Sequence, residues 1–132
     1  MVWVPPRPRH GGARLDTGIF QHVHVRFYDD DSDCAAGFSA AEWAKWTAAY
    51  PFTKFYVGLP ASPQAARSGF TDRGALCRAV LPLAQKAANY GGVMLWDRYF
   101  DKRSNYSGSI KSWVLRPSLL QKAFVGAAGN PL

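Results

Sequence analysis

Gly92-Val93-Met94-Leu95-Trp96 is one of three short runs of apolar, β-branched or aromatic residues that decide the fold of this chain. The other two runs are His22–Tyr28 and Lys54–Leu59. Each run is too short for a helix and is bounded by turn residues, so each predicts a β-strand. The second and third runs along the chain have consecutive apolar residues, a pattern typical of parallel strands buried on both faces.

The segment between the first two runs carries the clearest helix signal. Ser39 and Glu42 form a capping box, in which Ser39 is the N-cap and Glu42 reaches back to its backbone N–H. Apolar residues then recur at helical spacing from Trp43 to Tyr50, and Pro51 ends the helix.

Two more helices are predicted further along the chain. One covers residues 72–89, where Pro82 imposes a kink or an irregular turn and the Gly91-Gly92 pair ends the helix. The other begins near Ser107 and finishes before Pro117.

The alternation of strands and helices predicts an α/β fold with a parallel sheet built from right-handed βαβ units. The connections that follow the strands are the longer ones, and in such folds they carry the chemistry. We expect a disordered leader over residues 1–14 and a loosely ordered tail over residues 117–132.

Composition restricts the function classes. The chain has 132 residues, about one domain, and its 16 Lys and Arg against 9 Asp and Glu give a net charge of +7. The basic residues are scattered without a nucleic-acid signature, so we expect no nucleic-acid partner. No apolar run reaches the roughly 18 residues that span a bilayer, and the amino terminus lacks the apolar core of a signal peptide, so we expect no membrane segment and leave the localisation open.

Candidate metal ligands do not form a site. Read as a calcium loop, the acidic stretch that starts at Asp29 has Cys34 where glycine is needed and Ala40 where glutamate is needed. His22 and His24 share a strand face without a third ligand, and Cys34 and Cys77 lack metal-site spacing. We therefore expect no metal and no cofactor.

Two aromatic residues end predicted strands and suit a sugar site. Trp96 could stack on the apolar face of a sugar ring, and Tyr28 could donate its hydroxyl into a pocket. A glycosidase also needs a carboxylic acid to protonate the leaving oxygen. The single glutamate, Glu42, is already used in the capping box, so no catalytic residue is predicted.

Three segments carry a family resemblance. Phe20–Tyr28, Lys54–Ser62 and Tyr90–Asp101 resemble the C-terminal third of plant class III chitinases, which belong to glycoside hydrolase family 18 and fold as (β/α)8 barrels. The resemblance covers residues 15–114 and implies a partial barrel of about three βα units, the three predicted strands being barrel strands six, seven and eight. A complete barrel of this type needs about 250 residues.

The resemblance also bears on activity. Active chitinases have Gln-Phe-Tyr where this chain has Arg26-Phe27-Tyr28, and in this respect the chain is similar to the xylanase inhibitor proteins, inactive relatives that bind microbial xylanases. The resemblance implies that Tyr28 would bind the N-acetyl carbonyl of a sugar and that Trp96 would form the floor of the sugar site. It also implies that the Arg26 side chain would occupy the space of the N-acetyl group. It also implies a possible inhibitor contact at Arg73.

Other features depart from the family. The DxxDxDxE strand that supplies its catalytic acid is expected upstream of residue 1. Cys34 matches one half of a family disulfide whose partner would fall within residues 1–12, where this chain has no cysteine.

We therefore expect an inactive, xylanase-inhibitor-type chitinase-like fragment that binds a microbial xylanase or a chitin-type oligosaccharide, with a role in plant defence. A piece of an active class III endochitinase and a plain carbohydrate-binding or interaction fragment remain alternatives. Three parallel strands leave two open edges, which predicts self-association when the chain is expressed alone.

Overall fold

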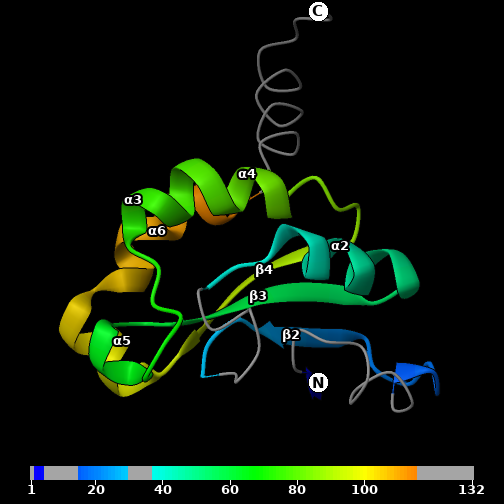
Figure 1. The fold of residues 1–132 in the computed structure, drawn as a ribbon, viewed down its shortest axis with the longest axis horizontal. Helices are drawn as coiled ribbons and strands as arrows, with labels where there is room; N and C mark the ends of the chain where they lie inside the picture. The colour runs from blue at the N-terminus through cyan, green and yellow to red at the C-terminus, as the bar shows by residue number, and fades with distance from the viewer. Residues whose placement is uncertain (1, 5–14, 30–36, 116–132) are drawn as a thin grey trace, which may run out of the picture.

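The computed structural model describes residues 2–4, 15–29 and 37–115. Its centre is a four-stranded sheet in the order β1-β2-β3-β4, and every neighbouring pair is parallel. The strands are β1 (Val2–Val4), β2 (His22–Arg26), β3 (Lys54–Pro60) and β4 (Tyr90–Trp96). Figure 1 shows α2, α4 and α6 on one side of the strands. The α/β class and the parallel arrangement predicted from the sequence are therefore present.

Strand β1 corrects the predicted leader. Residues Val2–Val4 were expected to be disordered, but they pair in parallel with β2, with Val2 opposite Val23 and Val4 opposite Val25. Two β-branched residues in a three-residue segment favour the extended conformation, yet such a segment is too short to give a periodic signal. The rest of the leader, residues 5–14, and the predicted tail, residues 117–132, lie outside the described residues.

The Gly91-Gly92 pair lies inside β4, so the prediction that it ends a helix is wrong. Gly92 has a φ of +144°, and the register between β3 and β4 shifts at Phe55/Tyr56. A Cβ atom at Gly91 would lie 2.7 Å from the Tyr56 ring. Glycine is needed here because the strand is irregular and the tyrosine ring approaches the backbone closely.

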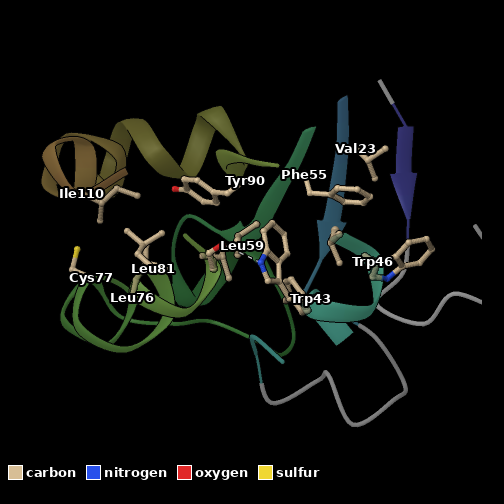
Figure 2. Close-up of a cluster of buried hydrophobic side chains, with 14 of the residues drawn as sticks. Val23, Trp43, Trp46, Phe55, Leu59, Leu76, Cys77, Leu81, Tyr90 and Ile110 are labelled. Atoms are coloured by element: carbon tan, nitrogen blue, oxygen red, sulfur yellow. Dashed lines mark hydrogen bonds between the residues drawn. The ribbon is translucent and has the colours of Figure 1, made fainter. Parts of the chain in front are cut away.

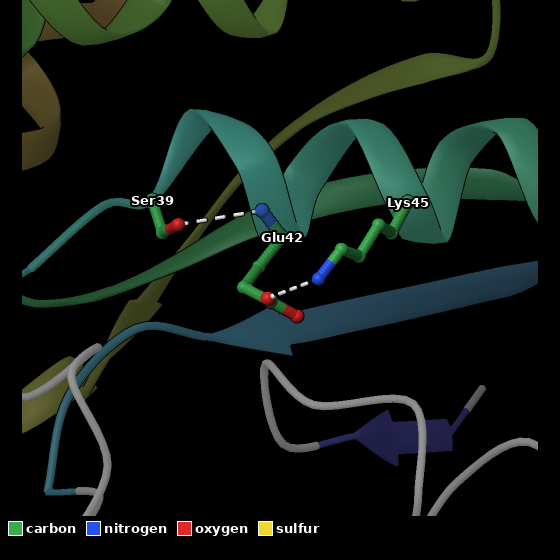
Figure 3. Close-up of polar contacts among 3 residues, drawn as sticks. All are labelled: Ser39, Glu42 and Lys45. Carbon is green, nitrogen blue, oxygen red and sulfur yellow. Dashed lines mark hydrogen bonds and ion pairs between the residues drawn. The ribbon is translucent and has the colours of Figure 1, made fainter.

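Helix α2 (Ala40–Ala49) follows the predicted pattern, and half of the capping box is present. The backbone N–H of Glu42 donates to Ser39 Oγ at 3.3 Å. The Glu42 carboxylate does not complete the box but pairs with Lys45 Nζ at 2.9 Å, one turn further along (Figure 3). This i,i+3 ion pair competes for the side chain that was predicted to reach back to Ser39.

The second predicted helix is shorter than expected and is irregular. It comprises α3 (Arg73–Ala75), the π-helical turn η3 (Leu76–Val80) and α4 (Leu81–Ala84). Pro82 is the second residue of α4, and the irregular turn precedes it, as expected where a ring replaces a backbone N–H.

This helix stops at Ala84 because the residues that follow pack against α2. The side-chain amide of Asn89 donates to the carbonyl oxygens of Thr47 and Tyr50, at 3.0 and 2.9 Å. These carbonyls belong to the last turn and the C-cap of α2, so Asn89 satisfies acceptors that the end of a helix leaves open.

Two helices follow β4, where the sequence analysis expected a loop and one helix. Helix α5 (Arg98–Ser104) is capped by Asp97, whose Oδ1 accepts from the Phe100 N–H at 3.3 Å. Asn105, with a φ of +54°, separates it from α6 (Tyr106–Val114). Asp101 then accepts hydrogen bonds from the backbone and hydroxyl of Ser107 at 2.7 and 2.6 Å.

The core lies between the sheet and its helices (Figure 2). Trp43 of α2 reaches across it, and its Nε1 donates to the carbonyl oxygen of Ala84 at 3.1 Å. The largest fully buried side chains of the core come from β3, the helices and the residue directly after β2: Trp46, Phe27, Phe55, Leu59, Leu76, Leu81 and Ile110. Within the described ranges, none of the helices is long and apolar enough to cross a membrane.

Candidate functional site

A cavity of about 330 Å³ opens at the carboxyl ends of β2 and β4 and is lined by Arg26, Tyr28, Asp29 and Trp96. Three of these are residues that the sequence analysis singled out. They come together because parallel strands end at the same edge of a sheet, although Tyr28 and Trp96 are far apart in the sequence.

Arg26 is the last residue of β2, and the backbone that follows holds its side chain. Its Nε donates to the Tyr28 carbonyl oxygen at 3.0 Å, and its Nη2 donates to the Asp29 carbonyl oxygen at 3.1 Å. The guanidinium carbon also lies 5.1 Å from the centroid of the Tyr28 ring, within range of a cation–π interaction. The cation is thus fixed in the wall of the cavity.

Tyr28 is buried, with its backbone closely covered by the loop that follows β3. A Cβ atom at Gly69 would lie 2.7 Å from Tyr28 Cα, and Gly69 has a φ of +90°, so only glycine fits there. Burial raises the pKa of the Tyr28 phenol far above its ordinary value; Arg26 opposes this shift, whereas Asp29 and Asp97 add to it. The phenol is therefore a neutral hydroxyl at any physiological pH.

Asp29 is the cavity residue that the sequence analysis did not place in the sugar site. Its Oδ1 accepts from the backbone N–H groups of Arg67 and Ser68, at 2.6 and 3.3 Å, and its own backbone has a φ of +50°. The carboxylate ties the end of β2 to the loop after β3. Its position directly after Tyr28 was the available signal, although Asp29 was predicted only as the start of an acidic stretch that fails as a calcium loop.

Trp96 closes the other side of the cavity. It ends β4, and its carbonyl oxygen accepts from the Ala61 N–H at 2.7 Å, which fixes the end of the strand against β3. The peptide bond between Trp96 and Asp97 is cis. The side chain is 46% exposed, so a large apolar ring face is open to a ligand.

Arg73 lies elsewhere. It is the first residue of α3, its side chain is exposed, and its Nη1 donates to Ser109 Oγ of α6 at 2.6 Å. The structure thus places the predicted partner contact on the helical layer, and Arg73 is not one of the residues that line the cavity.

The histidine pair lies further back along β2. His22 Nδ1 is 2.9 Å from the Tyr56 hydroxyl, and the ring of His24 meets the Tyr56 ring edge-on at 5.3 Å. Across the described ranges, no three His, Cys, Asp or Glu side chains gather in a way that could hold a metal ion.

The two cysteines differ in what the structure describes. Cys77 is a buried free thiol whose pKa is raised by burial. Cys34 and the acidic residues after Asp29 lie outside the described residues, as does any pairing of Cys34.

The cavity combines an exposed indole, a neutral phenol and a fixed guanidinium, which suits binding. Acid catalysis of glycoside cleavage requires a carboxylic acid beside the scissile oxygen. Asp29 is the carboxylate among the lining residues, and it already accepts two backbone hydrogen bonds. Glu42, the chain's one glutamate, is paired with Lys45 on α2.

Comparison with known proteins finds similarity to xylanase inhibitor proteins and endochitinases. It is 50% identical to Xylanase inhibitor protein 1 of Triticum aestivum over 110 residues, covering 83% of this chain and 36% of the relative. It is 40% identical to an acidic endochitinase of Vitis vinifera over 107 residues, covering 78% and 36%. No family model matches.

Among solved structures, the chain is similar to a xylanase–α-amylase inhibitor protein, XAIP-I, in complex with trehalose. The TM-score is 0.74 at 28% identity, over 86% of this chain and 44% of that chain. The homologues of this chain are thus xylanase inhibitor proteins and class III-type endochitinases, and its fold is similar to that of glycoside hydrolase family 18 barrel proteins. The chain spans a little over a third of the length of the curated relatives it matches.

Proposed function

We propose that this chain is a chitinase-like protein of the xylanase-inhibitor type without hydrolytic activity, in which β2, β3 and β4 correspond to barrel strands six, seven and eight. The observation that carries the proposal is the position of Arg26. Two hydrogen bonds to backbone carbonyls and the ring of Tyr28 fix its guanidinium in the wall of the cavity.

A fixed cation at this point opposes chitin binding in two ways. It occupies space beside the Tyr28 phenol, which the resemblance assigns to the N-acetyl group of the sugar. A bound sugar would also remove water from the Arg26 guanidinium without offering it an anionic partner, and this loss of hydration disfavours binding. The lining residues offer no carboxylic acid free of other hydrogen bonds to protonate a leaving group, which supports the proposed lack of hydrolysis.

The proposed partner is a microbial xylanase, and the proposed role is in plant defence. The 50% identity to a wheat protein named for xylanase inhibition supports this choice over a purely carbohydrate ligand. A net charge of +7 favours association with acidic surfaces, such as an enzyme cleft lined with carboxylates. Arg73, exposed at the start of α3, is the proposed contact residue.

An inhibition assay tests the proposal. The full chain is titrated into a panel of microbial endo-xylanases, and residual activity is measured on soluble xylan. We expect saturable inhibition of at least one enzyme, weakened by Arg73→Ala and unchanged by Arg78→Ala, a matched exposed arginine on η3. An absence of inhibition across the panel, together with cleavage of chitin oligosaccharides, would instead support the alternative that the chain is a piece of an active endochitinase.

A further inference from the structure

One side of helix α5 presents positive charge to solvent. Arg98 and Lys102 lie one helical turn apart on this side. Tyr99 and Arg103 form a second such pair beside them, and all four side chains are exposed. In the part of the chain that the structure describes, neither Arg98 nor Lys102 takes part in an ion pair. We call these four residues the basic face of α5.

The acidic residues of α5 and its N-cap make hydrogen bonds elsewhere. Asp97 caps the helix, and its Oδ1 accepts from the Phe100 N–H at 3.3 Å. Asp101 lies within the helix, but its two carboxylate oxygens accept hydrogen bonds from the backbone N–H and the hydroxyl of Ser107 on α6. These two carboxylates, both among the described residues, therefore leave the charge of the basic face without an ion-pair partner.

The basic face is held in place by the rest of the fold. Ser104 Oγ donates to the carbonyl oxygen of Ala61 at 2.8 Å, which ties the end of α5 to the residue directly after β3. Arg103 Nη1 donates to the Tyr99 hydroxyl at 3.0 Å, and its guanidinium carbon lies 5.4 Å from the centroid of that ring. A surface that is ordered before binding loses less entropy when a partner docks, and Tyr and Arg are enriched among the residues that dominate protein interfaces.

The basic face lies at the end of the sheet where the cavity opens. Helix α5 begins two residues after Trp96, so it is positioned at the carboxyl end of the strands. Figure 1 shows α3, which begins at Arg73, toward the same end. Charged side chains are almost never buried without a partner, so this face is not a packing surface for a neighbouring element. It suits a partner that carries negative charge.

We propose that the basic face of α5 binds the carboxylate-lined cleft of a microbial xylanase, as a contact surface additional to Arg73. This inference rests on the function proposed above. A glycoside hydrolase carries two carboxyl groups about 5–9.5 Å apart in its cleft. Residues one helical turn apart have Cβ atoms separated by about 5–6 Å, so Arg98 and Lys102 place two positive charges at a comparable spacing. The opposite charges also steer the encounter, which raises the association rate constant.

Surface plasmon resonance tests the proposal, with the full chain flowing over the immobilised xylanases of the inhibition panel. The double substitution Arg98→Glu and Lys102→Glu should slow association by about tenfold at low ionic strength. The difference should shrink at high salt, because salt screens charges across an interface. The matched control is Arg78→Glu with Lys86→Glu, since both residues are exposed and the net charge falls by the same amount. It should slow association by less than about threefold.

A neutral variant guards against a charge reversal that fails to fold. Arg98→Gln with Lys102→Gln should slow association in the same direction but by a smaller factor. A control variant that slows association as much as the α5 variants would assign the effect to net charge and overturn the proposal. Binding of double-stranded DNA by the wild type as tightly as of xylanase at the same salt would also overturn it, because the face would then bind any polyanion.

Binding and inhibition together separate this contact from the function proposed above. Xylanase binding that the α5 variants weaken, without inhibition, supports the α5 contact but contradicts the proposed function. Inhibition that the α5 variants leave intact contradicts the α5 contact alone. An absence of binding across the panel contradicts both.

Discussion

The guanidinium of Arg26 lies against the ring of Tyr28, 5.1 Å from its centroid, while its Nε donates to the carbonyl oxygen of the same residue. The last residue of β2 and a residue two positions further along the chain thereby hold each other at the mouth of the cavity. The backbone anchors the cation, and the cation packs on the phenol. In the function proposed above, this arrangement is the physical basis for a site that retains an aromatic floor without cleaving chitin.

Replacing Arg26 by glutamine should open the cavity to sugar. The Arg26→Gln variant removes the charge that a bound sugar would have to desolvate and leaves an amide able to bond to an N-acetyl group. We expect the affinity for a chitin trisaccharide to rise by about tenfold, equivalent to roughly 1.4 kcal/mol, measured by isothermal titration calorimetry. Arg78→Gln is the control, and an equal gain in both variants would contradict a specific block by Arg26.

Trp96 should supply most of any sugar affinity. Trp96→Ala in the Arg26→Gln background should weaken trisaccharide binding by about tenfold, because stacking on an aromatic face contributes about 1 kcal/mol. Since Trp96 is nearly half exposed, the substitution should change the free energy of unfolding little. Phe52→Ala removes an exposed aromatic outside the cavity and should leave binding unchanged. Undiminished binding without Trp96 would show that the sugar lies elsewhere.

Asn89 should stabilise the fold by joining the end of α2 to the start of β4. Asn89→Ala removes two hydrogen bonds to the carbonyls of Thr47 and Tyr50 and leaves both acceptors partly buried. We expect the free energy of unfolding to fall by about 1–3 kcal/mol in urea denaturation. Gln64→Ala, at an exposed position, should have almost no effect. A loss as small as that of the control would mean that water replaces these hydrogen bonds.

His24 should make stability depend on pH. Burial, the positive amino terminus and His22 lower its pKa below the ordinary value of 6.5. At pH 7 the ring is mostly neutral in the unfolded chain and more fully neutral in the folded one. As pH falls below 6.5, the unfolded chain takes up a proton that the folded chain resists, so stability is lost until the folded pKa is reached.

Urea denaturation of the wild type and of His24→Gln at pH 7 and pH 5 checks this dependence. The wild type should lose more stability than the variant over that interval. An equal loss in both proteins would assign the pH dependence to other groups.

Strands β2, β3 and β4 could be predicted because each is a short apolar run bounded by turn residues. Because parallel strands end at the same edge of the sheet, the ends of β2 and β4 then bring Tyr28 and Trp96 to one cavity. Arg26 was predicted at the site only through the family resemblance, because active chitinases have glutamine at this position. What the sequence could not show is that its side chain turns to carbonyl oxygens of its own strand end, since that depends on the loop after Tyr28.

The failures were local patterns decided by tertiary contacts. A Gly-Gly pair is typical of the end of a helix, but Gly91 and Gly92 lie inside β4, where the Tyr56 ring approaches the backbone too closely for a side chain at Gly91. Helix α5 has few apolar residues, so its sequence shows no helical periodicity from which it could be predicted. Its start depends instead on the N-cap that Asp97 provides. The predicted helix over 72–89 was too long because the hydrogen bonds of Asn89 to α2 compete with helix continuation.

The most direct test of the central claim is a turnover assay of the full chain on chitin oligosaccharides, followed by chromatography of the products. With Arg26 in the cavity wall and no catalytic acid among the lining residues, we predict no cleavage above the uncatalysed background. Cleavage by the wild-type chain that disappears in Tyr28→Phe would contradict the account, because it would show that the cavity is a working active site.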